Sequence, residues 1–517
     1  MARIKSVIFG GLAALVLSGL AATGASAQAS NVYLTPDGGG SGVCTNNVHT
    51  PSWFNNSANW GSGTSQIGPG TVVHLCGNFT GAANGNLLSF QGNGTSGHPV
   101  TILFESGAIL SAPYFSFSGA INMDNRSFVT VDGGTGGLIQ NTDNGSNKGN
   151  KQSSTGISAG SCSNCEIRNL TVANIYVHVP NETSVDQTNV IAIIMSGPNW
   201  LVHDNVIHDC GWCVRNFYRD GDTNVKVYNN NIYNADHGYI PAGNGNISAS
   251  NFYFYNNHVH DYAVWDTGTA DSFHHDGVHA FGVAGANLTN LQIYNNTFDG
   301  ATGGNFTSHI YVEHPDNSAA ETNPLVYNNI LDGTKEPAGN FGLLAIGDIS
   351  GAQAYNNTIV GPNNNGAYCV LAVGGSVTFK NNVISGCWAG FFFYRPTSTV
   401  TMNNNVYANQ GSCGIGYSSA AVCYPTIAEW RTFTGQEPNS QYATSAGLDS
   451  NFHPQTGSAV IGASANLFSL GVAGLEYDKS GAARKSSGAW DTGAYLSGSS
   501  TTAVQPVPPS GLTAIVH

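Results

Sequence analysis

The stretch Ile293-Tyr-Asn-Asn-Thr-Phe298 is one of eight copies of a six-residue pattern that runs apolar–x–Asn–Asn–x–apolar, with Asp once in the first Asn position. The copies are VHDNVI (202–207), VYNNNI (227–232), FYNNHV (254–259), IYNNTF (293–298), VYNNIL (326–331), AYNNTI (354–359), FKNNVI (379–384) and MNNNVY (402–407). The second polar residue of each copy marks the positions Asn205, Asn230, Asn257, Asn296, Asn329, Asn357, Asn382 and Asn404, which by subtraction lie 22 to 39 residues apart. Self-similarity on that scale is typical of a solenoid, in which each repeat forms one structural unit.

The residues around these copies favour a solenoid built from strands. The apolar runs are short and rich in β-branched and aromatic residues, as in Val190 to Met195 and Leu343 to Ile346, and Gly, Asn, Asp and Ser lie between them. Stacked coils of strands repeat about every 4.8 Å, so each repeated Asn can bond its amide to the Asn above and below. An Asn-rich disordered tract is the alternative, and the 41% hydrophobic content argues against it.

The closing part of the chain carries a family resemblance. It runs Asp449-Ser-Asn-Phe-His-Pro454, then Gly457-Ser-Ala-Val-Ile-Gly-Ala463, then Trp490-Asp-Thr-Gly-Ala-Tyr495. Together with the YNN repeats and only 9% charged residues, it resembles the right-handed parallel β-helix proteins of the pectate-lyase-like group, over roughly residues 100–496. The resemblance implies an all-β, right-handed parallel β-helix with N- and C-terminal caps. It leaves the activity open, because this fold hosts lyases, hydrolases, epimerases and adhesins.

The organisation along the chain follows from changes in composition. We expect a signal peptide over residues 1–27, an N-terminal cap over 28–99, and β-helix coils over 100–409. Residues 410–496 are expected to form a C-terminal cap and closing segment. The last segment, 497–517, is rich in Ser, Thr and Pro and is expected to be a flexible tail.

The N-terminus predicts export. Met1 to Lys5 is basic, Ser6 to Thr23 is mostly apolar, and Ala25-Ser-Ala27 is a small-x-small cleavage site. Cleavage near Ala27 would remove two positive charges and change the formal charge from −14 to −14 − 2 = −16. That balance disfavours nucleic acid, and it disfavours a polyanion unless Ca²⁺ or a local basic patch assists. We expect no membrane span, a secreted or periplasmic monomer, and an extracellular polysaccharide as partner.

The chain has ten cysteines, an even number that suits an exported protein. Neighbourhood in the sequence suggests the pairs Cys44–Cys76, Cys369–Cys387 and Cys413–Cys423. The remaining four form two C-x-x-C boxes, Cys162–Cys165 and Cys210–Cys213. We expect structural disulfides, and a metal site is the alternative.

The densest polar cluster falls where the repeat is longest. The two longest intervals, 39 and 33 residues, carry Asp271-Ser-Phe-His-His-Asp-Gly-Val-His279 and Ser308-His-Ile-Tyr-Val-Glu-His314. Alternate residues of a strand face opposite sides. If Ile310 and Val312 face the core, then His309, Tyr311 and Glu313 face outward. The same register brings together five side chains on adjacent coils, His237, Asp276, His279, Tyr311 and Glu313.

Two chemistries suit such a patch. For hydrolysis, the candidate carboxyl groups are Asp236, Asp271, Asp276 and Glu313. For β-elimination, His279 or His275 would be the base and Tyr311 the acid, while Arg219 or a Ca²⁺ ion held by Asp236, Asp271 and Asp276 would neutralise a uronate. His237, Trp265 and His309 are further candidates for substrate binding.

One strand of this patch also resembles a catalytic strand. His275-Asp-Gly-Val resembles the Asn-Thr-Asp-Gly-Ile strand of polygalacturonase-like hydrolases, which would place Asp276 on a catalytic Asp. The chain lacks the adjacent Asp pair of that family, since Ser308-His309 stands at the corresponding place, and it lacks the family's Arg-x-Lys strand.

Several functions remain open at this point. Asp-Gly pairs such as Asp276-Gly277 also form ordinary turns, and a lone His is often a hydrogen-bonded turn residue. The main expectation is cleavage of an extracellular polysaccharide along the coils by a glycoside hydrolase or a polysaccharide lyase. The alternatives are a non-catalytic glycan binder or adhesin, and a polysaccharide epimerase.

Overall fold

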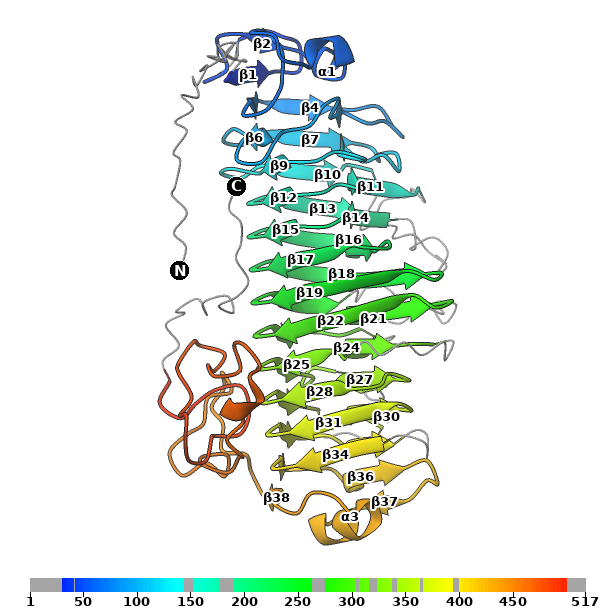
Figure 1. Ribbon diagram of the computed structural model, residues 1–517, viewed down its shortest axis with the longest axis vertical. Helices are drawn as coiled ribbons and strands as arrows, with labels where there is room; N and C mark the ends of the chain where they lie inside the picture. The colour runs from blue at the N-terminus through cyan, green and yellow to red at the C-terminus, as the bar shows by residue number, and fades with distance from the viewer. Residues whose placement is uncertain are drawn as a thin grey trace, which may run out of the picture.

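The computed structural model describes residues 30–40, 42–143, 152–176, 190–262, 275–303, 306–315, 323–336, 342–362, 366–393 and 399–499. The expected signal peptide lies outside the described residues, and so do Trp265, Asp271 and residues 500–517 of the tail. Within the described part, the chain forms the right-handed parallel β-helix that the repeats predict. Figure 1 shows its coils stacked along the long axis, from the blue N-terminal strands to the orange helix α3.

One side of every coil contributes to a 14-stranded parallel sheet. In chain order its strands are β1 (Asn31–Leu34), β2 (Val48–His49), β3 (Val72–Leu75), β6 (Val100–Phe104), β9 (Val129–Asp132), β12 (Cys165–Arg168), β15 (Trp200–His203), β17 (Thr223–Tyr228), β19 (Ser248–Tyr255), β22 (Asn287–Tyr294), β25 (Leu325–Tyr327), β28 (Ala352–Tyr355), β31 (Ser376–Lys380) and β34 (Thr399–Asn403). The sheet includes β1 and β3, so the stack of coils extends to the N-terminal side of residue 100.

The remaining sides of the coils form two further ladders that share the long strands β16 (Val206–Phe217) and β18 (Asn231–Asn244). The first ladder contains β4 (Asn78–Thr80), β7 (Ile109–Ala112), β10 (Leu138–Asn141), β13 (Thr171–Ile175), β20 (His258–Tyr262), β23 (Thr297–Asp299), β26 (Ile330–Asp332), β29 (Thr358–Val360), β32 (Val383–Ser385), β35 (Val406–Ala408) and β38 (Gln441–Ala443). The second ladder contains β11 (Ser154–Ala159), β14 (Val190–Met195), β21 (His275–Val283), β24 (Phe306–Glu313), β27 (Leu344–Gly347), β30 (Tyr368–Val373), β33 (Ala389–Phe393) and β36 (Gly414–Ser418). We call the second ladder, with the C-terminal halves of β16 and β18, the β21 face.

The other elements are short. They are the strands β5 (Leu88–Ser89), β8 (Ile121–Asn122) and β37 (Cys423–Tyr424), the helices α1 (Pro51–Phe54) and α3 (Ile427–Thr434), and the 3-10 turns η1 (Ser57–Asn59) and η2 (Phe468–Leu470). Helix α3 packs its buried Trp430 against Phe391 and Phe393 of β33, at the C-terminal end of the stack. Neither described helix is long enough or apolar enough to pass through a bilayer.

The Asn–Asn pairs shape the corner between the 14-stranded sheet and the first ladder. The first residue of each pair has a positive φ, for example 56° at Asn295 and 54° at Asn328, a conformation that Asn and Asp adopt more readily than other residues with a side chain. The second residue is buried and points along the axis. Asn296 Nδ2 donates to Asn329 Oδ1 at 3.0 Å, while its own Oδ1 accepts from Asn257 Nδ2 at 3.1 Å. The predicted Asn ladder is therefore confirmed, from Asn205 onward.

The last rung differs from the predicted residue. Asn382 donates to Asn405 at 3.2 Å, and Asn404 instead has the positive φ, 58°, that belongs to the first position of a pair. The prediction of Asn404 was wrong because three consecutive Asn residues hide the register. The ladder ends where Asn405 Nδ2 donates to the buried carboxylate of Glu437, beyond the last pair.

All ten cysteines are paired as neighbourhood in the sequence suggests. The disulfides are Cys44–Cys76, Cys162–Cys165, Cys210–Cys213, Cys369–Cys387 and Cys413–Cys423. Both C-x-x-C boxes are thus oxidised pairs, and the alternative of a cysteine metal site is wrong.

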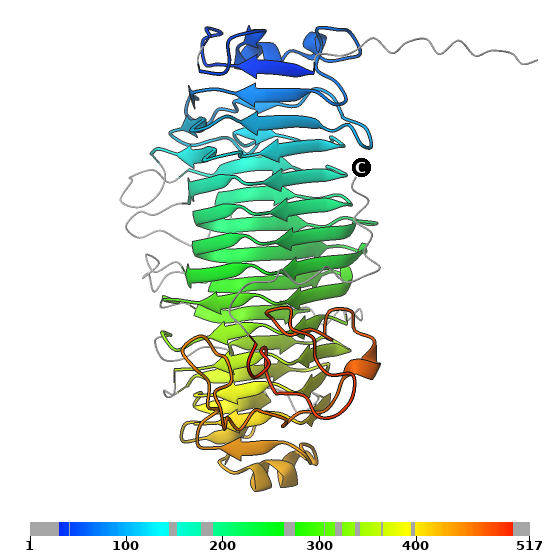
Figure 2. The same cartoon turned by 90° about the vertical axis from the view of Figure 1, so that its left-hand side faces the viewer.

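The closing segment returns along the outside of the coils. Tyr327 Oη donates to the carbonyl of Ala473, and Asn328 Nδ2 donates to that of Tyr477. A second apolar cluster, which includes Tyr294, Tyr327 and Trp490, lies between this segment and the 14-stranded sheet. In Figures 1 and 2 the orange and red segment covers the lower coils, on a different side from the β21 face.

Candidate functional site

The predicted patch lies on the outer side of the β21 face. The strand register places His237 beside Asp276 and His279 beside Tyr311, while Phe281 pairs with Glu313. Val278 and Ile310 fill the interior between these positions. Alternation turns His279, Tyr311 and Glu313 outward. His237 and Asp276 lie two residues before the core residues Tyr239 and Val278, so alternation alone does not account for their place beside His279.

Three side chains form the edge of the patch nearest to solvent. His279 Nε2 lies 3.1 Å from Glu313 Oε1, and Tyr311 Oη donates to Glu313 Oε2 at 2.5 Å. The Glu313 side chain is 16% exposed and the His279 side chain 10%. Burial, together with the nearby Glu313 carboxylate, raises the pKa of Tyr311. The phenol is thus protonated at neutral pH, and one carboxylate at this edge has two hydrogen-bonding partners.

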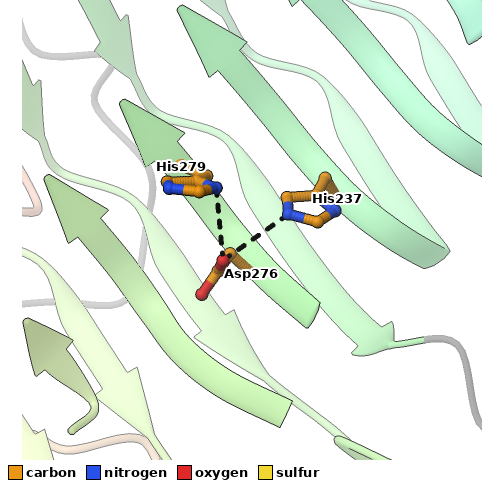
Figure 3. Close-up of side chains that lie close together, drawn as sticks. All are labelled: His237, Asp276 and His279. Atoms are coloured by element: carbon orange, nitrogen blue, oxygen red, sulfur yellow. Dashed lines mark ion pairs between the residues drawn. The ribbon is translucent and has the colours of Figure 1, made fainter. Parts of the chain in front are cut away.

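Behind this edge lies a fully buried group of carboxylates and imidazoles. Figure 3 shows Asp276 between the rings of His237 and His279. Asp276 Oδ2 lies 3.6 Å from His237 Nε2 and 3.7 Å from His279 Nδ1. Burial raises the pKa of Asp276 well above its ordinary value, and the nearby carboxylates of Asp236 and Glu313 add to the shift. Burial also lowers the pKa of His279, although Glu313 opposes this.

A second buried carboxylate extends the group. Asp236 Oδ2 lies 3.4 Å from His237 Nδ1, and Asp236 Oδ1 lies 3.3 Å from His275 Nε2. His275 has no exposed surface, so it does not reach a substrate in this structure. Of the two bases predicted for elimination, only His279 belongs to the solvent-facing edge.

The prediction that His309 faces outward is wrong. Its side chain is completely buried, and its Nδ1 is hydrogen-bonded to Tyr262 Oη at 2.8 Å among the rings of Phe298 and Phe306. The amides of His309 and Ile310 both donate to the carbonyl of Leu343, at 3.1 and 3.2 Å. That pattern is a β-bulge, which breaks the alternation and turns two consecutive side chains to the same side. His309 is therefore part of the core.

The buried His309 should make the fold sensitive to acid. Burial lowers the pKa of His309 from 6.5 to about 4. Between these values the unfolded chain binds a proton that the folded chain does not, so stability falls as the pH drops from 6.5 to 4, by roughly 3 kcal/mol in total. We expect His309→Gln to lose less stability than the wild type between pH 7 and pH 4.5 in urea unfolding. Equal losses in the two proteins would contradict this assignment.

Arg219, a predicted substrate ligand, lies away from the patch. Arg219 lies beyond the end of β16, and its guanidinium contacts Ser161 Oγ, which follows β11. The structure places another cation on the β21 face. Arg215 pairs with Ile240 on the next coil. Because Tyr239 pairs with Val278, Ile240 lies beside His279 on the coil after that. Arg215 therefore lies in the same outward column as His279, two coils away.

The environment of Arg215 is unusual for a surface cation. Its guanidinium carbon lies 4.8 Å from the centroid of the Trp212 ring and 3.3 Å from that of Phe217. Burial lowers the pKa of Arg215 to about 10, so it is still charged at neutral pH. Among the described residues it makes no ion pair with a carboxylate. The sequence signal for Arg215 was the alternation along β16, which becomes informative only once the register with β18 is known.

On the other side of Tyr311 the outer surface becomes apolar and then aromatic. Tyr311 packs with Ala345, Leu371 and Val373, and Phe392 lies against this cluster. Phe392 stacks on Tyr368 with ring centroids 4.6 Å apart and also contacts Tyr417 at 5.1 Å. By contrast, the neighbouring Phe391 is a core residue. The β21 face thus presents a cation, a polar cluster and an aromatic stripe along successive coils.

Comparison with known proteins identifies no family. No family model and no curated protein matches the chain. The chain is similar to three solved structures, each at low identity. The first is XylC in complex with xylose, at 11% identity and TM-score 0.41, covering 75% of this chain and 86% of that chain. The second is the pectate lyase Pel9A, at 14% identity and TM-score 0.39, covering 92% and 98%. The third is the alginate lyase AlyGC of family PL6, at 11% identity and TM-score 0.35, covering 77% and 56%.

Proposed function

We propose that this protein is a secreted polysaccharide lyase that cleaves an acidic extracellular polysaccharide on the outer side of the β21 face. The observation that carries the proposal is the group of Glu313, Tyr311 and His279 at the solvent edge of the polar patch. The five disulfides and the export pattern at the N-terminus support secretion.

The group supplies both proton transfers of a β-elimination. The Glu313 carboxylate takes the proton from the carbon next to the uronate carboxyl group, and the electron pair of that bond forms the new double bond. The glycosidic oxygen leaves with the proton of Tyr311. The direct hydrogen bond between Tyr311 Oη and Glu313 Oε2 then returns a proton from the carboxylic acid to the phenolate. One proton has moved from carbon to oxygen, and both residues are back in their starting states.

Burial of the second carboxyl group favours elimination over hydrolysis. A glycoside hydrolase places two carboxyl groups on either side of the scissile bond. Asp276, the catalytic carboxyl group that the sequence suggested beside Glu313, has no exposed surface and lies behind His279. Glu313 is thus the one carboxylate of the described cluster that reaches solvent, while the adjacent phenol is held protonated, as a lyase acid must be.

Arg215 and the aromatic stripe suggest how the polymer binds. A chain laid along the axis would pass Arg215 about 10 Å from the His279 position, which is two coil spacings. Because Arg215 makes no ion pair within the described residues, it is available to a substrate carboxylate. On the other side of the cluster, Tyr368, Phe392 and Tyr417 offer rings on which sugars can pack.

The test is a polysaccharide panel of uronate-containing and neutral polymers, with Tyr311→Phe beside the wild type. Elimination creates a double bond that absorbs in the ultraviolet, whereas hydrolysis releases reducing ends without that absorbance. We expect absorbance and reducing ends to rise together on an acidic polymer, and Tyr311→Phe to lower the rate by about 100-fold or more. Reducing ends alone would replace the lyase by a hydrolase. Solvent deuterium in an uncleaved polymer would indicate an epimerase, and binding without turnover a glycan-binding protein.

A further inference from the structure

The buried end of the patch has the geometry of a metal site. One ligand atom from each of His237, Asp276 and His279 lies within 4.8 Å of the other two. The carboxylate oxygen lies 3.6 Å from His237 Nε2 and 3.7 Å from His279 Nδ1, which is beyond good hydrogen-bond distance. Ligands of a tetrahedral zinc ion with bonds of 2.0 to 2.2 Å are about 3.3 to 3.6 Å apart. Small side-chain shifts would therefore bring all three atoms onto one ion.

The other nitrogen of each imidazole meets a carboxylate. His237 Nδ1 lies 3.4 Å from Asp236 Oδ2, and His279 Nε2 lies 3.1 Å from Glu313 Oε1. Such carboxylate–histidine–metal chains are the usual surroundings of histidine ligands, because the outer carboxylate fixes the ring orientation and makes the inner nitrogen more basic. Both histidines have this arrangement, and in both the inner nitrogen faces the same oxygen of Asp276.

The charges of the cluster also call for a cation. Asp236, Asp276 and Glu313 lie together, and each has an imidazole nitrogen within 4 Å of a carboxylate oxygen. Crowded buried carboxylates are costly, because each negative charge is removed from water and repels the others. A divalent ion at this point would compensate the negative charge and leave the imidazoles neutral.

We propose that His237, Asp276 and His279 bind one divalent transition-metal ion, with zinc as the best fit. Two nitrogens and one carboxylate oxygen are zinc ligands, whereas Ca²⁺ takes six to eight oxygens and rarely nitrogen. This ion is a different one from the Ca²⁺ expected at Asp236, Asp271 and Asp276. It would connect β18 to β21 and hold His279, which contacts Glu313. The inference does not depend on the proposed lyase activity.

A second histidine cluster provides the matched control. His258, His260 and Asp299 also have ligand atoms within 4.8 Å of one another. They lie on the surface, with the His258 side chain 46% exposed, and His258 Nε2 is already hydrogen-bonded to Asp299 at 2.8 Å. Adventitious metal should bind there, so the double variant His258→Gln/His260→Gln separates surface binding from the buried site.

The experiment measures zinc directly on the full chain, purified without a polyhistidine tag. After dialysis against trace zinc, mass spectrometry should find about one ion per chain in the wild type and in the surface double variant. Asp276→Asn and His237→Gln should lower the affinity for zinc at least 100-fold. Cobalt should give the strong visible absorption of a tetrahedral site in the wild type and in the surface double variant, but not in Asp276→Asn or His237→Gln. Stoichiometric zinc that survives in Asp276→Asn, or that is lost in the surface double variant, would overturn the proposal.

Thermal unfolding gives a readout that a folding defect cannot imitate. Zinc should raise the melting temperature of the wild type and leave that of Asp276→Asn unchanged. In chelator, Asp276→Asn should be at least as stable as the wild type, because Asn has the shape of Asp and removes a fully buried carboxyl group. A variant that is less stable than the wild type in chelator, with an unchanged response to zinc, would contradict the assigned site.

Discussion

Glu313→Gln is expected to lower kcat/KM for polysaccharide cleavage by about 10²- to 10⁴-fold, the usual contribution of a general base. Glutamine has the same shape and can still accept the hydrogen bond from Tyr311 Oη, but it cannot take a proton from the substrate. The side chain lies at the solvent edge of the patch, so the fold should tolerate the change. Initial rates from ultraviolet absorbance on the acidic polymer that the panel identifies would measure the effect.

A similar pair elsewhere on the molecule serves as the control. Glu105 Oε1 lies 2.6 Å from His74 Nδ1, so Glu105→Gln also changes a carboxylate that contacts an imidazole. That pair lies on the N-terminal coils, on the side of the 14-stranded sheet. Glu105→Gln should retain the wild-type rate. If Glu313→Gln also keeps it, with both variants folded, then the chemistry takes place at another site.

The alternation of strand residues predicted most of the patch. Knowing that Ile310 and Val312 face the core was enough to turn Tyr311 and Glu313 outward, and both lie on the outer surface. The same rule failed at His309, one residue before Ile310, because a bulge lies between the two. A bulge depends on which carbonyl two consecutive amides reach on the next coil. Nothing in the local sequence encodes that choice, so the alternation misleads there.

Contacts between coils were harder to predict than those within a coil. His237 and Asp276 are 39 residues apart and meet only because β18 and β21 pair in one register. The spacing of metal ligands within one segment therefore gave no hint of the histidine cluster. The corners with Asn pairs were easier to predict, since each pair lies within one short segment. The first Asn has a positive φ and the second is the buried member of the ladder. Their one failure, at Asn404, came where a third Asn made two registers possible.

Asn296→Ala is expected to destabilise the fold by about 3 kcal/mol or more, a large effect for one uncharged side chain. Asn296 Oδ1 accepts from both the amide and the Nδ2 of Asn257, and Asn296 Nδ2 donates to the carbonyl of Phe254 and to Asn329 Oδ1. Alanine removes these four bonds at a site with no exposed surface, and it leaves buried polar groups without partners, each of which costs about 1 to 3 kcal/mol. The midpoint of urea unfolding would measure the loss.

The neighbouring residue separates the ladder from the turn. Asn295 adopts a φ of 56°, which glycine adopts without strain, so Asn295→Gly should cost less than about 1 kcal/mol. Equal losses in Asn295→Gly and Asn296→Ala would mean that the corner, and not the ladder, is the sensitive feature. In Asn296→Ala, amide hydrogen exchange should also rise first on β22 and β25, because in a solenoid each coil contacts mainly its neighbours.

Asn296→Asp tests whether donation along the ladder matters. An aspartate keeps the oxygen that accepts from Asn257, but its second oxygen would face the carbonyl of Phe254 and Asn329 Oδ1. Only the protonated acid can donate there, so folding should raise the pKa of this carboxyl group above its unfolded value. A raised pKa in the folded state means that stability is lost as the pH rises through it. Asn296→Asp should therefore lie closer to the wild type at pH 5 than at pH 8, whereas the deficit of Asn296→Ala should be nearly the same at both.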